Sequence, residues 1–195
     1  VGGLLSMLGR GDAAGELAAV HALCSLAEHA GSHGDLSTGL ASLVELASSG
    51  GDSQAEAIAT VHKLAAGGEP RACAALASSS ASIALLVRQL GGDAAERAPA
   101  VSSLRQLCGR EEAQASIVAA GGVAALVAVA QAPELSSGTR REAALVLASL
   151  ATAANATAIA SSGGVGVLIA ALELAARDCE VTQAAASALR ELVGC

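Results

Sequence analysis

The sequence predicts an all-α fold in which helical repeats stack into a solenoid. Three observations predict it: a motif outline that recurs at nearly constant spacing, apolar residues placed three and four positions apart, and a composition without Phe, Tyr or Trp. Recurrence at about 40 to 47 residues is typical of solenoids with two or three helices per repeat. Such a fold needs contacts between neighbouring repeats only, so it does not depend on one deep aromatic core.

Two independent sets of leucines measure the recurrence. The first set stands early in an apolar helix of each unit, at Leu4, Leu43, Leu86, Leu126 and Leu168, with gaps of 39, 43, 40 and 42 residues. The second set stands near the end of the following longer helix, at Leu26, Leu64, Leu107, Leu150 and Leu192, with gaps of 38, 43, 43 and 42 residues. Because both sets agree, the chain holds about 4.5 to 5 repeats.

The period predicts one domain over residues 1–195. Val1 is not an initiator methionine, and we expect the chain to be a fragment of a longer protein. The expected repeats cover approximately residues 1–30, 31–69, 70–110, 111–153 and 154–195.

Apolar spacing and turn residues place the expected helices in order. The first two cover residues 1–8 and 14–29, and the glycines between 31 and 38 predict an irregular segment. Pro70 fits the first turn of a short helix that ends near Ala77. Later short helices are expected over 111–119 and 155–161, each followed by Gly-Gly.

Three capping boxes mark the expected starts of long helices. In each, a short polar side chain accepts from the third amide while an acid reaches back to the cap. Pro99 would interrupt the middle helix, which predicts either a kink or a start nearer Ala98. The pairs are Ser53 with Glu56, Asp93 with Glu96, and Thr139 with Glu142.

The charge balance argues against nucleic acid and membranes as partners. The net charge is −7, and the longest basic run is Arg140-Arg141, whereas phosphate backbones and anionic lipids select clusters of Lys and Arg. Residues 113–133 and 143–172 are uncharged and long enough to span a bilayer. Each contains a Gly-Gly pair and several polar residues, so we expect buried solenoid helices instead.

No catalytic group, cofactor or metal site is predicted. The five cysteines lack the close pairs of zinc sites, and we expect free thiols in a reducing compartment. His29 and His33 stand four apart near Cys24, but Gly31 interrupts the helix and no acidic ligand joins them, so a solvated helix end is expected. We therefore expect a protein that is not an enzyme.

One outline recurs most clearly in the second half of the chain. It is a short helix with Ile near its end, then Gly-Gly-Val, x-x-Leu-Val, a turn, and Ala-Ala-x-x-Leu-x-x-Leu-Ala. Ile117, residues 121–127 and 143–151 meet it, and Ile159 with residues 163–169 and 185–192 meets it again. This outline resembles the armadillo repeat family, well over residues 111–193 and more loosely before Ala81. The resemblance implies a right-handed superhelix of three-helix repeats that binds partners along a concave groove lined by its long helices.

The resemblance also implies candidate partner-binding residues. In peptide-binding members of the family, an asparagine before the last conserved leucine of the long helix bonds the partner's main chain, often with a tryptophan four residues earlier. No asparagine or tryptophan stands at these positions here, and Ser, Lys and Glu do not replace the donor and acceptor of an amide. Binding through another face, or to a folded surface, therefore stays open. The corresponding pairs are His21 and Ser25, Ala59 and Lys63, Ser102 and Gln106, Leu145 and Ser149, and Ser187 and Glu191.

Two functions follow from the resemblance. The first is a non-catalytic scaffold that binds or organises partner proteins, as an extended peptide or a folded surface, within a larger assembly. The second is the substrate-recruiting domain of a U-box-type ubiquitin ligase, which requires a U-box upstream. We expect a cytoplasmic location, with nuclear, cytoskeletal and ciliary locations as alternatives; richness in Ala, Gly and Ser is compatible with a green-algal ciliary scaffold.

Overall fold

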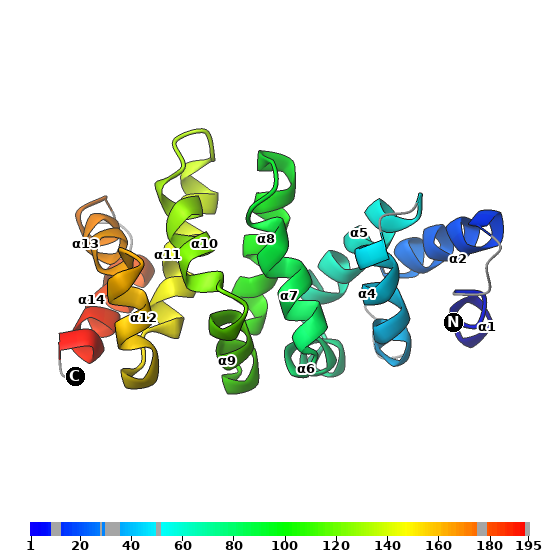
Figure 1. Ribbon diagram of the computed structural model, residues 1–195, viewed down its shortest axis with the longest axis horizontal. Helices are drawn as coiled ribbons and strands as arrows, with labels where there is room; N and C mark the ends of the chain where they lie inside the picture. Colours follow the sequence, from blue (N-terminus) through cyan, green and yellow to red (C-terminus); the bar gives the residue numbers. More distant parts are fainter. Residues whose placement is uncertain (9–12, 28, 30–35, 50–51, 175–178, 194–195) are drawn as a thin grey trace. The chain divides into compact units, whose positions relative to one another are not determined.

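The computed structural model describes residues 1–8, 13–27, 29, 36–49, 52–174 and 179–193. Within these ranges every regular element is a helix, as Figure 1 shows. The chain divides into two compact units, residues 1–85 and 86–195, and the boundary falls within α7 (Ser80–Gln89).

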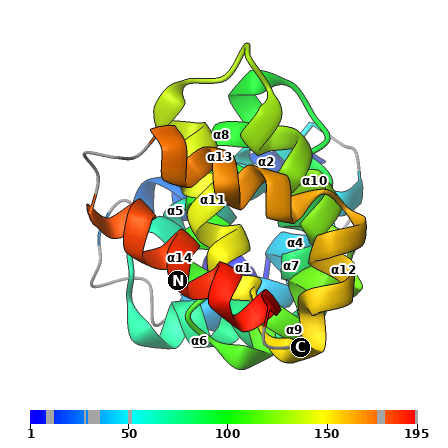
Figure 2. The ribbon, with the colours of Figure 1, turned by 90° about the vertical axis from the view of Figure 1, so that its left-hand side faces the viewer.

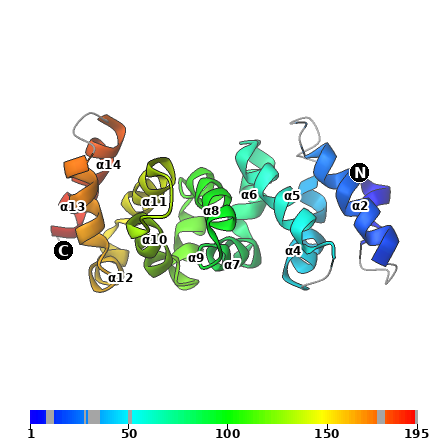
Figure 3. The ribbon, with the colours of Figure 1, turned by 90° about the horizontal axis from the view of Figure 1, so that it is seen from above.

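The first unit is built around α5. Helix α4 packs along α5, α2 packs on α5, and α1 contacts α2 (Figure 3). Leu23, Leu43 and Leu64, one from each of α2, α4 and α5, are fully buried at these contacts. Besides the start of α7, the elements are α1 (Gly2–Leu5), α2 (Ala13–Leu26), η2 (Ser37–Gly39), α4 (Leu40–Ser49), α5 (Gln54–Ala66) and α6 (Pro70–Ser78).

The second unit is centred on α11. This helix contacts α8, α10, α13 and α14, and in Figure 2 α13 lies across α10 and α11. Besides the end of α7, the elements are α8 (Ala94–Leu107), α9 (Glu111–Ala119), α10 (Gly122–Gln131), α11 (Ser137–Leu150), η3 (Ala153–Asn155), α12 (Ala156–Ser161), α13 (Gly164–Leu174) and α14 (Cys179–Val193).

Each late Gly-Gly pair makes a sharp turn between a short helix and the next helix. Gly121 and Gly163 have φ of +78° and +80°, a left-handed conformation that glycine adopts without steric cost. Helices α9 and α10 meet at 84° across the first of these turns. No single helix in the described ranges is long and apolar enough to cross a membrane; three pairs of consecutive helices pass by length and composition only when joined across bends of 84° to 108°.

The periodic leucines form the core of both units. Seven of the ten are fully buried, and the other three, in the first two helices and the last one, are half-buried. Complete burial of a leucine side chain stabilises a fold by about 1.5–3 kcal/mol, so these positions supply much of the driving force. The seven are Leu43, Leu64, Leu86, Leu107, Leu126, Leu150 and Leu168.

Several expected boundaries are confirmed, and others are wrong. Helices α6, α9 and α12 agree with the expected short helices within one residue. Helix α1 ends at Leu5 rather than at residue 8, and α2 ends at Leu26 rather than at His29. Most of the segment expected to be irregular, 31–38, lies outside the described residues.

At one of the three predicted capping boxes, the cap side chain accepts a hydrogen bond from the third amide as expected. The Asp93 carboxylate accepts from the amides of Ala95 and Glu96, at 2.9 and 3.0 Å, and caps α8. Helix α8 runs through Pro99, so the alternative start near Ala98 is wrong. Ser53 stands at the N-cap of α5, but its side chain makes no capping bond.

The box expected at Thr139 is wrong. Helix α11 begins three residues earlier than Thr139 would place it, because the Ser136 hydroxyl accepts from the Thr139 amide at 3.1 Å. Leu135, directly before this cap, is buried. Thr139 and Glu142 therefore lie within α11 rather than at its start.

Candidate functional site

Three long helices of the second unit share one carboxylate. Glu180 of α14 pairs through Oε1 with Arg105 Nη2 of α8 at 2.6 Å, and through Oε2 with Arg141 Nη2 of α11 at 2.9 Å. The side chains are 34%, 44% and 53% exposed for Arg105, Arg141 and Glu180. Ion pairs this exposed stabilise a fold by about 0–1 kcal/mol, so the cluster is accessible and contributes little to folding.

A pocket of about 280 Å³ opens at this cluster. Gln106, a residue predicted to bind partners, lies in its wall. Leu145 of α11, which belongs to the predicted pair Leu145 and Ser149, lies there too. We call it the polar pocket; its lining residues are Arg105, Gln106, Arg141, Glu142, Leu145 and Glu180.

The other candidates in the second unit do not line this pocket. The Ser149 hydroxyl donates to the Leu145 carbonyl at 3.0 Å, so its hydrogen is used within its own helix. Ser102 is half-buried on α8, and Ser187 and Glu191 are exposed on α14. The structure therefore brings Gln106 into a pocket and leaves these residues along the same helices without a shared site.

The predicted partner-binding residues of the first unit make contacts mainly between α2 and α5. Lys63 of α5 donates to the Cys24 carbonyl at 3.3 Å and also reaches Cys24 Sγ. His21 Nε2 lies 3.5 Å from Glu56 Oε1, and the Ser25 hydroxyl donates to the His21 carbonyl at 3.1 Å. These groups already have partners within the unit, and their role in binding a partner protein stays a prediction.

Sequence reasoning did not identify Arg105, Arg141 and Glu180. They stand 2, 9 and 12 residues before the equivalent leucines Leu107, Leu150 and Leu192, so aligning equivalent positions does not bring them together. One signal could have found them: only 15% of residues are charged, and these three stand on long helices in an otherwise Ala-rich region.

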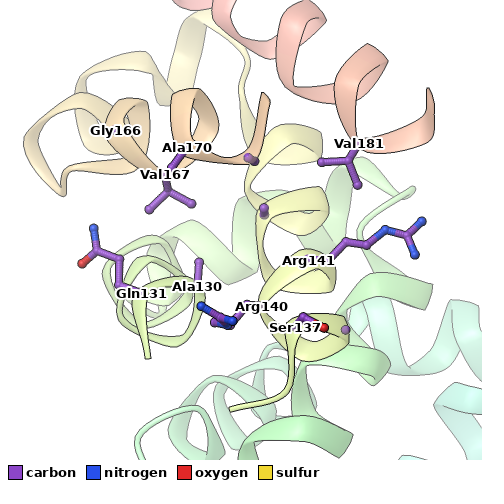
Figure 4. A pocket seen from close by; sticks show the side chains of 12 residues that line it. Ala130, Gln131, Ser137, Arg140, Arg141, Gly166, Val167, Ala170 and Val181 are labelled. Atoms are coloured by element: carbon purple, nitrogen blue, oxygen red, sulfur yellow. The ribbon is translucent and has the colours of Figure 1, made fainter. Parts of the chain in front are cut away.

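A second pocket, of about 430 Å³, lies between α10, α11, α13 and α14 (Figure 4). Its wall is mostly Ala, Gly and Val, with Arg140 and Arg141 from the first turns of α11. We call it the apolar pocket.

The sequence predicts no metal site and free thiols, and the described residues test these expectations only in part. Among them, no group of three or more His, Cys, Asp or Glu side chains is placed to hold a metal ion, and His33 lies outside the described residues. Cys24, Cys73 and Cys108 form no disulfide. The absence of a metal site in the whole chain stays a prediction.

Solved structures resemble this chain, although no family model and no curated protein sequence matches it. Computationally designed armadillo repeat proteins for modular peptide recognition match with 19% identity and a TM-score of 0.72, over 95% of this chain and 79% of that chain. A designed armadillo repeat protein in complex with the peptide (KR)4 matches with 18% identity and a TM-score of 0.58, over 97% and 98%.

The chain has an armadillo-repeat fold. A structure from work on the interaction between cadherin and beta-catenin also matches, with 18% identity, a TM-score of 0.75, and coverage of 97% of this chain and 36% of that chain. At these identities the matches establish the armadillo fold, and the ligand must be inferred from the residues. The exact repeat boundaries stay a prediction.

Proposed function

We propose that this armadillo-repeat chain is a non-catalytic scaffold that binds an extended segment of a partner protein at the long helices of its second unit. The observation that carries the proposal is the polar pocket, where α8, α11 and α14 present accessible charged and amide groups side by side. Support comes from the designed armadillo proteins, one made for modular peptide recognition and another in complex with a peptide.

The chemistry of the polar pocket suits a peptide main chain. An extended backbone presents both N–H donors and C=O acceptors. Arg105 and Arg141 supply donors for carbonyls, whereas Glu142 and Glu180 accept from amides. Gln106 does both, and Leu145 offers an apolar contact for a partner side chain.

The exposed ion pairs make the pocket adaptable. Because the Arg105–Glu180 and Arg141–Glu180 pairs contribute little to stability, a ligand can replace one of them at small cost. A partner carboxylate would pair with the arginines, and a partner ammonium with the glutamates. Because the pocket holds charges of both signs, it selects partner segments by the geometry of their hydrogen bonds rather than by the sign of their charge.

The proposal includes a reducing, cytoplasmic compartment, in keeping with Cys24, Cys73 and Cys108, which form no disulfide. Substrate recruitment within a U-box-type ubiquitin ligase stays a sequence-based prediction, since none of the three structures described above is a ligase.

Selection from a random peptide library on the immobilised chain tests the proposal. We expect enriched peptides whose affinity falls about tenfold in Arg105→Gln, because a hydrogen bond to a charged group contributes about 1.5–3 kcal/mol. Arg71→Gln is the matched control, since Arg71 is exposed on α6 in the first unit. The proposal fails if no peptide is enriched, or if both variants bind the enriched peptides as the wild type does.

A further inference from the structure

The apolar pocket is separate in chemistry from the polar pocket. Its volume of about 430 Å³ falls within the range of about 300–1,000 Å³ that is usual for small-ligand sites. Val167 and Ala170 of α13, Val181 of α14 and Ala144 of α11 give its wall an aliphatic part. Small aliphatic side chains leave this space unfilled, and none of the lining residues in the described part of the chain is aromatic.

Gly166 lines the pocket. It stands inside α13, where glycine weakens a helix relative to alanine. A Cβ at this position would meet no described atom within 4 Å, so no neighbour requires glycine here. Gly164 differs, because a Cβ there would lie 2.6 Å from Ile159 Cγ2. A Cβ at position 166, in the wall of the pocket, would therefore stand in open space.

Arg140 brings an incompletely satisfied cation to this pocket. Its Nε is buried and has no hydrogen-bond partner among the described residues, which is uncommon in folded proteins. In Figure 4 the Arg140 side chain lies beside Ala130, whereas the Arg141 side chain points away from Ala130. Arg141 pairs with Glu180, so Arg140 is the cation available to a ligand in the pocket.

The charged side chains in the described lining are both arginines, of which Arg141 is paired with Glu180. The chain carries a net charge of −7, yet the lining contains two arginines and, among the described residues, no Asp or Glu. Helix α11 begins with Ser137 and Gly138 in the wall, and the N-terminus of a helix carries partial positive charge. Both features favour an anion.

We propose that the apolar pocket binds an aliphatic carboxylate, with the carboxylate at Arg140 and the start of α11 and the hydrocarbon against Val167, Ala170 and Val181. A carboxylate would give the guanidinium the acceptor that no described residue supplies to its Nε, in a charge-assisted hydrogen bond. Two sources present this chemistry: a free medium-chain acid, and the C-terminal carboxylate of a peptide that ends in an aliphatic residue.

Methyl NMR spectra of Val167 and Val181 test the binding. We expect sodium octanoate to shift both residues' methyl signals in a saturable way, and 1-octanol and sodium acetate to bind at least tenfold more weakly. A hexapeptide ending in leucine, with a free carboxylate or as its amide, forms the second arm. If octanoate alone saturates the shifts, the ligand is a free acid. If only the peptide with the free carboxylate does so, the ligand is a peptide C-terminus. If both do so, the pocket recognises the chemistry that they share.

Two variants connect the binding with the pocket. Arg140→Gln is expected to weaken binding about tenfold to a hundredfold, and Arg71→Gln to leave it unchanged. Gly166→Leu fills the pocket and should abolish binding, while Ala115→Leu, at an exposed site on α9, should not. Thermal unfolding followed by circular dichroism shows whether each variant is folded.

Four results would overturn the proposal. They are octanol binding as tightly as octanoate, acetate binding as tightly as octanoate, unchanged affinity in a folded Arg140→Gln or Gly166→Leu variant, and no saturable shift with either octanoate or the peptide. Since no polar-pocket peptide is used, these results are independent of the library selection.

Discussion

At the scale of single residues, adjacent glycines have different physical roles. Gly121 takes a left-handed conformation, whereas Gly122 allows close approach: a Cβ at Gly122 would lie 2.5 Å from Ile117 Cγ2 and 2.7 Å from its carbonyl oxygen. Gly163, Gly164 and Ile159 repeat the arrangement one period later. The sequence shows the pairs as turns, but the second role needs coordinates, since it depends on how closely the two helices approach.

Gly122→Ala should therefore destabilise the protein by about 1–3 kcal/mol, because the new methyl group overlaps a backbone carbonyl that cannot rotate away. Gly166→Ala is the matched control and should stabilise the protein by about 0.5–1 kcal/mol, because its methyl group meets open space within a helix. Urea unfolding followed by circular dichroism measures both. Equal effects of the two substitutions would show that the described contacts do not distinguish these glycines.

At the scale of helices, the start of each long helix depends on which polar residue is held at the N-cap. Asp93 was predictable because it directly follows Gly-Gly, and it makes two capping bonds. At α11 two candidate caps, Ser136 and Thr139, stand three residues apart. The structure has Ser136 as the cap, next to the buried Leu135, and local sequence rules do not include such tertiary burial.

Removing the α8 cap should cost stability. Asp93→Ala leaves two helix amides without their acceptor, and we expect a loss of about 1 kcal/mol. Ser53→Ala removes an N-cap side chain that makes no capping bond and should cost less than about 0.5 kcal/mol. Chemical denaturation compares the two; a larger loss in Ser53→Ala contradicts the description of the caps.

The ion pairs between long helices should matter for binding more than for folding. Glu180→Gln is expected to change the free energy of unfolding by less than about 1 kcal/mol, because both pairs are exposed. The same variant should alter the affinity of peptides selected on the wild type, measured by titration calorimetry. A loss of several kcal/mol in stability would instead assign the cluster a structural role.

At the scale of the whole molecule, the repeat period predicted most of the fold. It located the leucine core and the late short helices, because both depend on local spacing that the sequence shows directly. The site was less predictable. The resemblance proposed Gln106, whose role in binding stays a prediction. Arg105, Arg141 and Glu180 meet through the packing of three helices, and Arg140 is notable for a buried Nε that has no hydrogen-bond partner among the described residues.

Stability should be distributed by unit. Leu126→Ala, within the second unit, should cost about 2–5 kcal/mol and speed amide exchange mainly in residues 86–195, because solenoids are stabilised by contacts between neighbours. Leu43→Ala should act mainly on residues 1–85. Hydrogen exchange with mass spectrometry measures both, and uniform acceleration across the chain in either variant contradicts this prediction.

The central claim is that the long helices of the second unit bind protein, and NMR during titration with a selected peptide tests it most directly. We predict saturable shifts of the Leu145 methyl groups and the Gln106 side-chain amide, which line the polar pocket. Shifts confined to α9 and α12, with Leu145 and Gln106 unchanged, would contradict it.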